Sequence, residues 1–266
     1  MLGIGLSLPA YYHFKRNEKI TKIISESSHI SIVSIESEDE AKKFAKDFEH
    51  TPIIHHLSNV APADISGPDL ARMEKLDKIS KILDALWCLE DVGAWSINGF
   101  PAPYFIATIL DQEWLDVLVE RISKINNITS TPFLLEIPSF SFIAGSMTLP
   151  DFMNQLTDRL GNDVVMDVSH IFSYAIATGK EPIEVLKALD LSKVREVHIA
   201  GGKINKKYTY RYIDSHSDPI MPEVFALLQY AIEHCANLKA VTFEISEYQS
   251  EALILDDYAK LKEICQ

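Results

Sequence analysis

Eight strand-like segments alternate with helical segments along the whole chain, and this alternation restricts the fold more than any other feature. The strands fall at about 2–7, 30–35, 52–57, 85–90, 132–137, 163–168, 194–200 and 240–245, and helical patterns include 39–48, 69–83, 113–125, 149–160 and 256–264. Several strands are apolar at nearly every position, as expected of parallel strands covered on both faces. Eight β-then-α units predict an α/β fold, a closed (βα)8 TIM barrel. An open doubly wound sheet is the alternative, but no Gly-x-Gly-x-x-Gly or Walker loop supports nucleotide binding there.

The length of the chain suits one barrel. A (βα)8 barrel takes about 250 residues, and the 266 residues contain no repeat, low-complexity tract or interdomain linker. We therefore expect a single TIM-barrel domain over residues 1–266. Two connections, Val92–Leu110 and Gly201–Pro219, are longer than the others. Both follow strands, so we expect them at the barrel mouth, where long loops often shape substrate sites.

Charge and composition exclude some classes of protein. The formal net charge is −13 and no block of basic residues interrupts it, so nucleic acid is not an expected partner. No apolar run approaches the roughly 18 residues of a membrane span. Residues 1–9 resemble a strand more than a signal peptide. Cys88, Cys235 and Cys265 lie far apart without a Cys-x-x-Cys pair, which favours reduced thiols and a cytoplasmic location.

Most of the predicted strands end on a histidine or a carboxylate. The clearest runs are Pro52-Ile-Ile-His55, Ala85-Leu-Trp-Cys-Leu-Glu-Asp91, Phe133-Leu-Leu-Glu136, Val164-Val-Met-Asp167, Val194-Arg-Glu-Val-His198 and Val241-Thr-Phe-Glu244. The C-terminal ends of parallel strands meet at one mouth of a barrel. Residues that are distant in sequence are therefore expected to converge on one site.

The residue types at these strand ends predict a metal site. Four histidines and five carboxylates are the expected ligands: His55, Asp91, Glu136, Asp167, His170, His198, Asp214, His216 and Glu244. The pairs Asp167-x-x-His170 and Asp214-x-His216 are short enough for both side chains to reach one ion. Nitrogen and oxygen donors suit Fe, Zn or Mn. Because five carboxylates would leave strong uncompensated repulsion around one divalent ion, we predict two or three ions.

Several residues keep a second interpretation at this level. A single Asp or Glu at a strand end is as often a helix N-cap or a surface residue. His56 should point to the strand face opposite His55, and either Glu90 or Asp91 could face the metals. A basic loop is either solvated or a clamp for a carboxylate-bearing substrate or acidic partner, and its residues are Lys203, Lys206, Lys207 and Arg211.

The ligand spacing resembles two related groups of barrel enzymes. Asp167-x-x-His170, Asp214-x-His216 and Glu244 look like the trinuclear zinc site of endonuclease IV-type barrels, whose fold is shared with xylose isomerase-like barrels. The closer resemblance is to the multinuclear non-haem iron-dependent oxidative enzymes. It is carried by Gly3-Ile-Gly-Leu6, Leu134-Leu-Glu-Ile-Pro-Ser139, Met166-Asp-Val-Ser-His170 and, most specifically, Glu196-Val-His-Ile-Ala-Gly201 and Ile213-Asp-Ser-His216. Within that family, the compact length and the His-His-Leu-Ser segment at 55–58 look most like the methanobactin-biosynthesis, MbnB-type members.

The resemblance implies an iron-dependent oxidase that uses O2 to modify cysteines of a ribosomally made precursor peptide. MbnB-type members convert cysteine to an oxazolone with an adjacent thioamide, as a heterodimer with a small MbnC-like companion protein. Two or three non-haem iron ions in a mixed Fe(II)/Fe(III) state are implied. Glu136 is our candidate for a bridging carboxylate because it lies centrally in strand order, and Asp214 and His216 are further catalytic candidates. Leu89-Glu-Asp-Val92 departs from the family's Ser-Glu-His-Leu motif, and His170 stands where many members have Asn.

Other functions fit the same set of residues. A zinc metallohydrolase of the endonuclease IV type would use metal-bound hydroxide on a phosphodiester, although the acidic charge argues against a DNA substrate. A sugar isomerase or epimerase would need one or two divalent ions and no O2. A non-enzymatic binding module is the remaining alternative, and it accounts least well for so many charged groups in one place.

Overall fold

Parallel strands close into a barrel, as the sequence predicts. The computed structural model describes residues 1–14, 18–98, 100–208 and 211–265. Within these ranges, eight strands form the barrel in the order β1-β12-β9-β8-β7-β4-β3-β2. They are β1 (Ile4–Pro9), β2 (Ile30–Val33), β3 (Ile53–His56), β4 (Cys88–Asp91), β7 (Phe133–Glu136), β8 (Val164–Asp167), β9 (Val194–Ala200) and β12 (Ala240–Glu244). Each overlaps a predicted strand, so the (βα)8 fold is confirmed.

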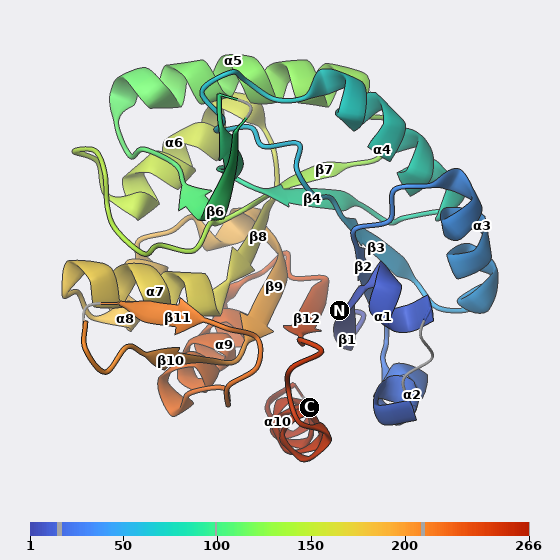
Figure 1. The fold of residues 1–266 in the computed structure, drawn as a ribbon. Helices are drawn as coiled ribbons and strands as arrows, with labels where there is room; N and C mark the ends of the chain where they lie inside the picture. Colours follow the sequence, from blue (N-terminus) through green and yellow to red (C-terminus); the bar gives the residue numbers. More distant parts are fainter. Residues whose placement is uncertain (15–17, 99, 209–210, 266) are drawn as a thin grey trace.

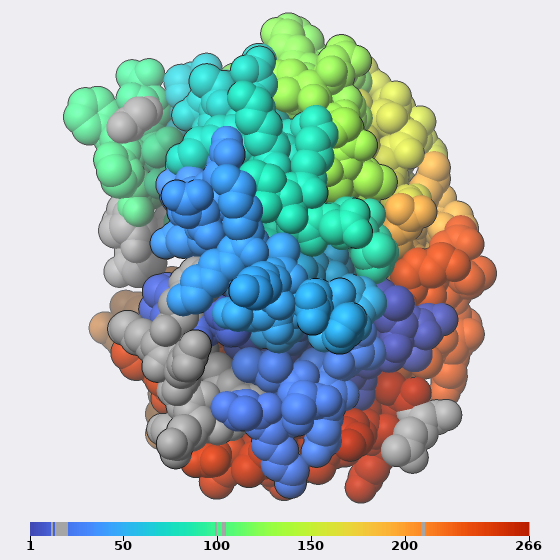
Figure 2. All heavy atoms as spheres, turned by 90° about the vertical axis from the view of Figure 1, so that its right-hand side faces the viewer, coloured from blue at the N-terminus to red at the C-terminus, as the bar shows by residue number. Residues whose placement is uncertain are grey.

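Helices surround the barrel (Figure 1). They are α1 (Ala10–Phe14), α2 (Glu18–Glu26), α3 (Glu38–Asp47), α4 (Leu70–Ile82), α5 (Gln112–Ile128), α6 (Leu149–Leu160), α7 (Val168–Thr178), α8 (Pro182–Lys187), α9 (Pro222–His234) and α10 (Glu251–Ile264). Local sequence starts several of them, because the side chains of Ser37, Asp69, Asp111, Thr148 and Ser250 each accept the backbone N–H three residues ahead. On the flank in Figure 2, blue α3 and teal α4 form the outer surface.

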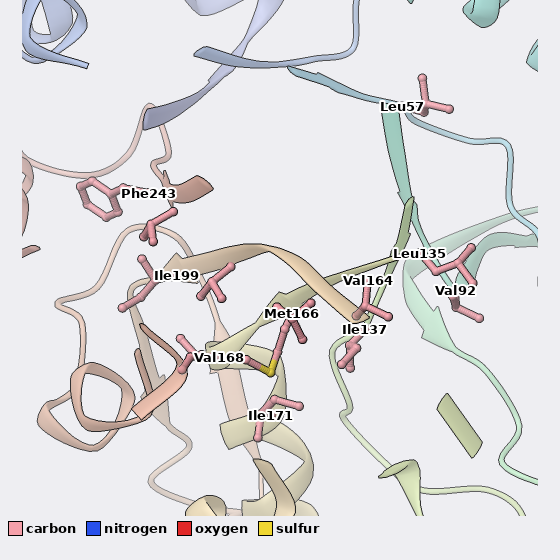
Figure 3. Packing of buried hydrophobic residues seen from close by; sticks show 14 of the residues in the cluster. Leu57, Val92, Leu135, Ile137, Val164, Met166, Val168, Ile171, Ile199 and Phe243 are labelled. Atoms are coloured by element: carbon pink, nitrogen blue, oxygen red, sulfur yellow. The ribbon is translucent and has the colours of Figure 1, made fainter. Parts of the chain in front are cut away.

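Apolar side chains fill both sides of the barrel wall. Outside the wall, Met166 of β8 packs near Val168 and Ile171 of α7, within one large buried cluster (Figure 3). Inside the wall lies a smaller cluster made of Ile54, Trp87, Leu89, Leu134, Val165 and Ala240. Side chains alternate along a strand, so residues two positions further on also face inward, above this cluster. This alternation decides which strand-end residues enter the mouth.

The two long connections contain β-hairpins where the sequence analysis expected loops. One pairs β5 (Gly93–Ile97) with β6 (Phe100–Ala107), and the other pairs β10 (Gly202–Ile204) with β11 (Tyr212–Asp214). They follow β4 and β9, so both rise from the C-terminal mouth, as expected for these connections. Thr209 and Tyr210, within the second connection, lie outside the described residues.

The described helices and the cysteines are consistent with the composition. In the part of the chain that the structure describes, no helix is both long and apolar enough to cross a membrane. Cys88, Cys235 and Cys265 are free thiols, as expected. Burial raises the pKa of Cys88 to about 12, so this strand residue belongs to the core and is a poor nucleophile.

Candidate metal centre

The ends of the barrel strands, helix α7 and the second long connection together bring nine ionisable side chains into the mouth of the barrel. They are His56, Asp91, Glu136, Asp167, His170, His198, Asp214, His216 and Glu244. Eight of these nine residues are among the predicted ligands, with His56 in place of His55. Most are almost completely buried, whereas the His216 side chain is 32% exposed. His216 therefore lies on the side of the cluster that solvent reaches.

Glu136 lies at the centre of the cluster. Its Oε1 is 3.1 Å from His198 Nδ1, and its Oε2 is 3.1 Å from His56 Nε2. In the described ranges, three groups of potential ligands have atoms within 4.8 Å of one another, and all contain Glu136: His56–Glu136–His198, Glu136–Asp167–His198–Glu244 and Asp91–Glu136–His170. A carboxylate whose two oxygens face different groups has the arrangement that a bridging ligand needs.

Asp214 joins the outer part of the cluster. Its Oδ2 lies 3.0 Å from His170 Nε2 and 3.2 Å from His216 Nε2. His216 also approaches Glu244, with Nε2 3.7 Å from Oε2. The backbone of His216 has φ +52°, a left-handed conformation that is uncommon for a residue with a side chain. Hydrogen bonds from His216 N to Gly201 O (2.9 Å) and from Ser246 N to His216 O (2.9 Å) hold it there.

Backbone contacts orient the Asp167–His170 pair. His170 Nδ1 donates to Ile137 O at 2.7 Å, so Nε2 is the ring atom that faces the acids. Asp167 Oδ1 accepts from Ser169 N (2.6 Å) and His170 N (3.1 Å), capping α7. Its other oxygen, Oδ2, is buried and accepts no hydrogen bond from the part of the chain that the structure describes. Asp167 is thus a helix N-cap through one oxygen and a potential ligand through the other.

The donor atoms of this cluster fit metal ions. Among the described residues, Asp167 Oδ2 and Asp214 Oδ1 are buried oxygens without a hydrogen-bond partner. Unpaired buried carboxylate oxygens are costly, and a cation would satisfy them. Imidazole nitrogen and carboxylate oxygen are donors that Fe, Zn and Mn share. The arrangement can therefore hold more than one divalent ion.

The pKa values of the histidines and carboxylates show how the cluster compensates its negative charge when no metal is bound. Burial lowers the pKa of His56 and His216, but nearby carboxylates, Glu136 for the first and Asp214 for the second, outweigh it and raise the values to about 10 and about 9. Burial also raises the pKa of Glu136, yet His198 and His56 bring it well below its usual value. Protons on the histidines therefore compensate the carboxylates. Metal ions would replace these protons.

The structure corrects the assignment on β3. His55 was expected to be a ligand, but its Nδ1 lies 2.7 Å from Ser80 Oγ of α4, outside the barrel wall. Burial lowers the pKa of His55 to about 3, so it is neutral. His56 faces the cluster because it shares a strand face with Ile54, a member of the interior cluster. The run Ile53-Ile54 is apolar at both positions, so the sequence offered no alternation from which to infer the face.

On β4 the structure separates the two acids. Asp91 lies with Glu136 and His170, while Glu90 Oε2 accepts a hydrogen bond from Val60 N at 3.2 Å. The position where the resembling family has histidine is thus occupied by a carboxylate that faces the cluster. In the basic loop, Lys203 pairs with Asp218, with Nζ 2.9 Å from Oδ2.

Comparison with known proteins gives a family match over the whole chain. The family model described as "RiPP precursor modification enzyme MbnB/TglH/ChrH" matches residues 1–266. A UPF0276 protein of Caulobacter vibrioides is 23% identical over 235 residues, covering 86% of this chain and 81% of that protein. A UPF0276 protein of Vibrio vulnificus is 24% identical over 247 residues, covering 86% of this chain and 79% of that protein.

Solved structures share the fold at low identity. Endonuclease IV from Thermus thermophilus matches with a TM-score of 0.60 and 15% identity, covering 98% of this chain and 99% of that chain. A xylose isomerase domain protein from Planctomyces limnophilus matches with a TM-score of 0.64 and 13% identity, covering 98% and 96%. The IOLI protein with a binding zinc atom matches with a TM-score of 0.65 and 14% identity, covering 98% of each chain. These matches confirm the xylose isomerase and endonuclease IV-like barrel.

Proposed function

The chain belongs to the MbnB/TglH/ChrH family of RiPP precursor modification enzymes, and from this premise we propose that it is an O2-dependent, non-haem iron oxidase acting on peptidyl cysteine. RiPPs are ribosomally synthesised and post-translationally modified peptides, so membership makes the chain a peptide-modifying enzyme. The finer proposal is conversion of cysteine to an oxazolone with an adjacent thioamide, as in methanobactin-type copper chelators. The expected partners are a cysteine-containing precursor peptide and a small MbnC-like protein in a heterodimer.

The observation that carries the proposal is the nine-residue cluster centred on Glu136. Five carboxylates and four histidines lie in one buried mouth, and Glu136 belongs to each of its three ligand groups. Two or three iron ions would be held by these groups, with Glu136 as the shared carboxylate. Bound iron would supply the redox chemistry with O2 that protein side chains lack. Zinc fits the same donor types, and the family membership is what favours iron.

The residues at the exposed edge support a substrate-facing role. The His216 side chain is 32% exposed, and Asp214 Oδ2 lies 3.2 Å from its Nε2. We assign this pair a catalytic role, because it can hold or accept a proton where a peptide thiol would arrive from solvent. The hydrogen bonds to Gly201 O and from Ser246 N hold the backbone of His216 in its left-handed conformation and so help to place the imidazole.

The rim of the mouth supports a peptide as substrate. The β5–β6 hairpin exposes Trp95 and Phe100, which are 42% and 73% accessible. The β10–β11 hairpin carries the exposed Lys206 and Lys207 on the other long connection. Together they offer apolar and basic contacts beside the site, beyond what a small sugar would need.

Metal content and O2 uptake test the proposal together. The protein should be purified with the small proteins encoded beside it, its bound metals measured, and O2 consumption followed with a cysteine-containing precursor peptide. We expect iron at more than one ion per chain, O2 uptake that depends on the peptide, and a mass change confined to cysteine. Stoichiometric zinc with no O2 consumption would contradict the oxidase and favour a hydrolase or an isomerase.

A further inference from the structure

A further buried carboxylate, outside the nine-residue cluster, lies beneath it. Glu196 of β9 is fully buried, two residues before His198. It accepts hydrogen bonds from Trp87 Nε1 at 2.6 Å, from His198 Nε2 at 3.0 Å and from the hydroxyl of Thr242. Both of its oxygens are therefore satisfied, and every partner is a hydrogen-bond donor. No part of the proposed metal centre requires Glu196 as a ligand.

These donors determine where the hydrogen of His198 lies. An ionised carboxylate only accepts hydrogen bonds, so Nε2 of His198 must carry a hydrogen. Without a metal, Nδ1 also carries a hydrogen, because it faces a carboxylate; when a cation displaces that hydrogen, the neutral imidazole keeps its one N–H at Nε2 and Nδ1 has a free lone pair. Nδ1 is the atom that faces Glu136 Oε1 at 3.1 Å and Glu244 Oε1 at 3.4 Å. The ring therefore presents an acceptor nitrogen to the place where a cation would sit.

A chain of hydrogen bonds with defined donors and acceptors continues from Glu196 toward the other end of the barrel. Because Thr242 gives its hydroxyl hydrogen to Glu196, its oxygen accepts from His29 Nε2 at 2.9 Å. His29 Nδ1 can then accept from Ser28 Oγ at 3.0 Å. Gly5 makes room for the ring, since an added Cβ there would lie 2.2 Å from His29 Nε2. Each group in this buried chain thus has one consistent direction of donation.

We propose that Glu196 is a positioning residue that fixes His198 in the Nε2–H tautomer, so that Nδ1 is its metal-binding atom. The proposal rests on the metal centre of the proposed function, because it needs His198 to be a ligand. A carboxylate that holds the second nitrogen of a metal-binding histidine typically changes metal affinity or activity by about 10–100-fold. Glu196 would act on the metal through His198 and not by contact.

Zinc binding by the metal-free protein tests this role without any activity assay. Glu196→Gln should bind Zn²⁺ about 10–100-fold more weakly than wild type, measured by competition with a chromophoric chelator. An amide cannot accept from all three donors, since its NH2 group would face one of them. Asp77→Asn is the matched control. Asp77 is also a buried carboxylate, but it accepts from Ser130 N and Thr131 N, away from the cluster, so its substitution should leave zinc affinity unchanged.

A direct measurement of the tautomer needs no variant. In zinc-loaded protein labelled with ¹⁵N-histidine, NMR should show His198 with a protonated Nε2 and a zinc-bound Nδ1. The opposite tautomer would overturn the proposal, as would Glu196→Gln binding zinc as tightly as wild type while His198→Ala binds it weakly. If His198→Ala also binds zinc normally, it is the metal centre of the proposed function that fails, and the role of Glu196 fails with it.

Discussion

His55 and His56, adjacent in β3, lie on opposite sides of the barrel wall. Nδ1 of His55 is 2.7 Å from Ser80 Oγ of α4, whereas Nε2 of His56 is 3.1 Å from Glu136 Oε2 inside the mouth. One histidine therefore secures a helix to the barrel, and its neighbour faces the candidate ligands. Replacing each histidine in turn therefore separates the contribution of β3 to stability from its contribution to metal binding, at two neighbouring residues.

The two histidines should respond differently to alanine. His56→Ala should lower metal affinity by about 100-fold or more and leave the fold intact. Residues that only hydrogen-bond to a ligand typically change the affinity by about 10–100-fold, and a ligand itself should contribute more. His55→Ala removes one of the two hydrogen-bond partners of Ser80 Oγ and leaves a small void, so we expect a loss of about 1–3 kcal/mol in unfolding free energy with metal affinity unchanged. Urea unfolding measures the stability of each variant, and zinc titration measures its metal affinity. The reverse pattern would show that β3 faces the other way.

The Asp214–His216 pair should be needed for metal binding but not for folding. Asp214→Ala removes the oxygen shared by His170 and His216, and His216→Ala removes the exposed imidazole. Either variant should contain less metal per chain than wild type, measured by elemental analysis, with an unchanged circular dichroism spectrum. Unchanged metal content would remove this pair from the site.

Gly5 should tolerate no side chain while His29 is present. A Cβ at Gly5 would lie 2.2 Å from His29 Nε2, and the ring is held between Ser28 and Thr242. We expect Gly5→Ala to cost about 1–3 kcal/mol of stability, the usual range for overpacking a core. In a double-mutant cycle, His29→Ala should recover part of this loss. Strictly additive effects would show that the two positions do not meet.

His29 should make the protein less stable in acid. Burial lowers the pKa of His29 to about 4 from its ordinary 6.5; Glu196 on β9 raises it and His198 lowers it further. Between these two values the unfolded chain binds a proton that the folded chain does not, so stability falls as the pH drops from 6.5 toward 4. The full contribution is about 3 kcal/mol.

Comparison with a variant isolates this effect from the acidic cluster. His29→Gln keeps a donor for Thr242 but cannot titrate, so its unfolding free energy should change less over the same pH range. The measurement is urea unfolding of both proteins in a metal chelator, at pH values on both sides of 6.5. Parallel curves for the two proteins would rule out His29 as the titrating group.

The architecture and the convergence of the site could be predicted from the sequence. Apolar runs separated by helical patterns gave all eight strands, and parallel strands in a barrel must end at one mouth. That geometry alone brings Asp167, His198 and Glu244 together, although they are far apart in sequence. The resemblance in spacing then pointed to the family that the full-length match confirms.

What the sequence did not reveal depends on side-chain direction and on packing. The face of β3 was ambiguous because Ile53 and Ile54 are both apolar. The hairpin after β4 had a usable signal, Asn98-Gly99, a pair typical of tight β-turns, and Asn98 indeed has φ +52°. Glu196 stood within a recognised motif, but its role became visible only once Trp87 and Thr242 were known to lie against it.

Within the described residues, each of the two hairpins at the mouth forms its own two-stranded sheet, apart from the barrel ladder. The ladder partners of β5 and β10 are β6 and β11, so the register of the barrel does not depend on them. The β5–β6 hairpin can therefore vary without changing the barrel wall, whereas the β10–β11 hairpin carries Asp214 of the cluster. Exchange of the β5–β6 hairpin between relatives should be a practical way to redirect the enzyme to another peptide, because that segment contains none of the nine candidate ligands.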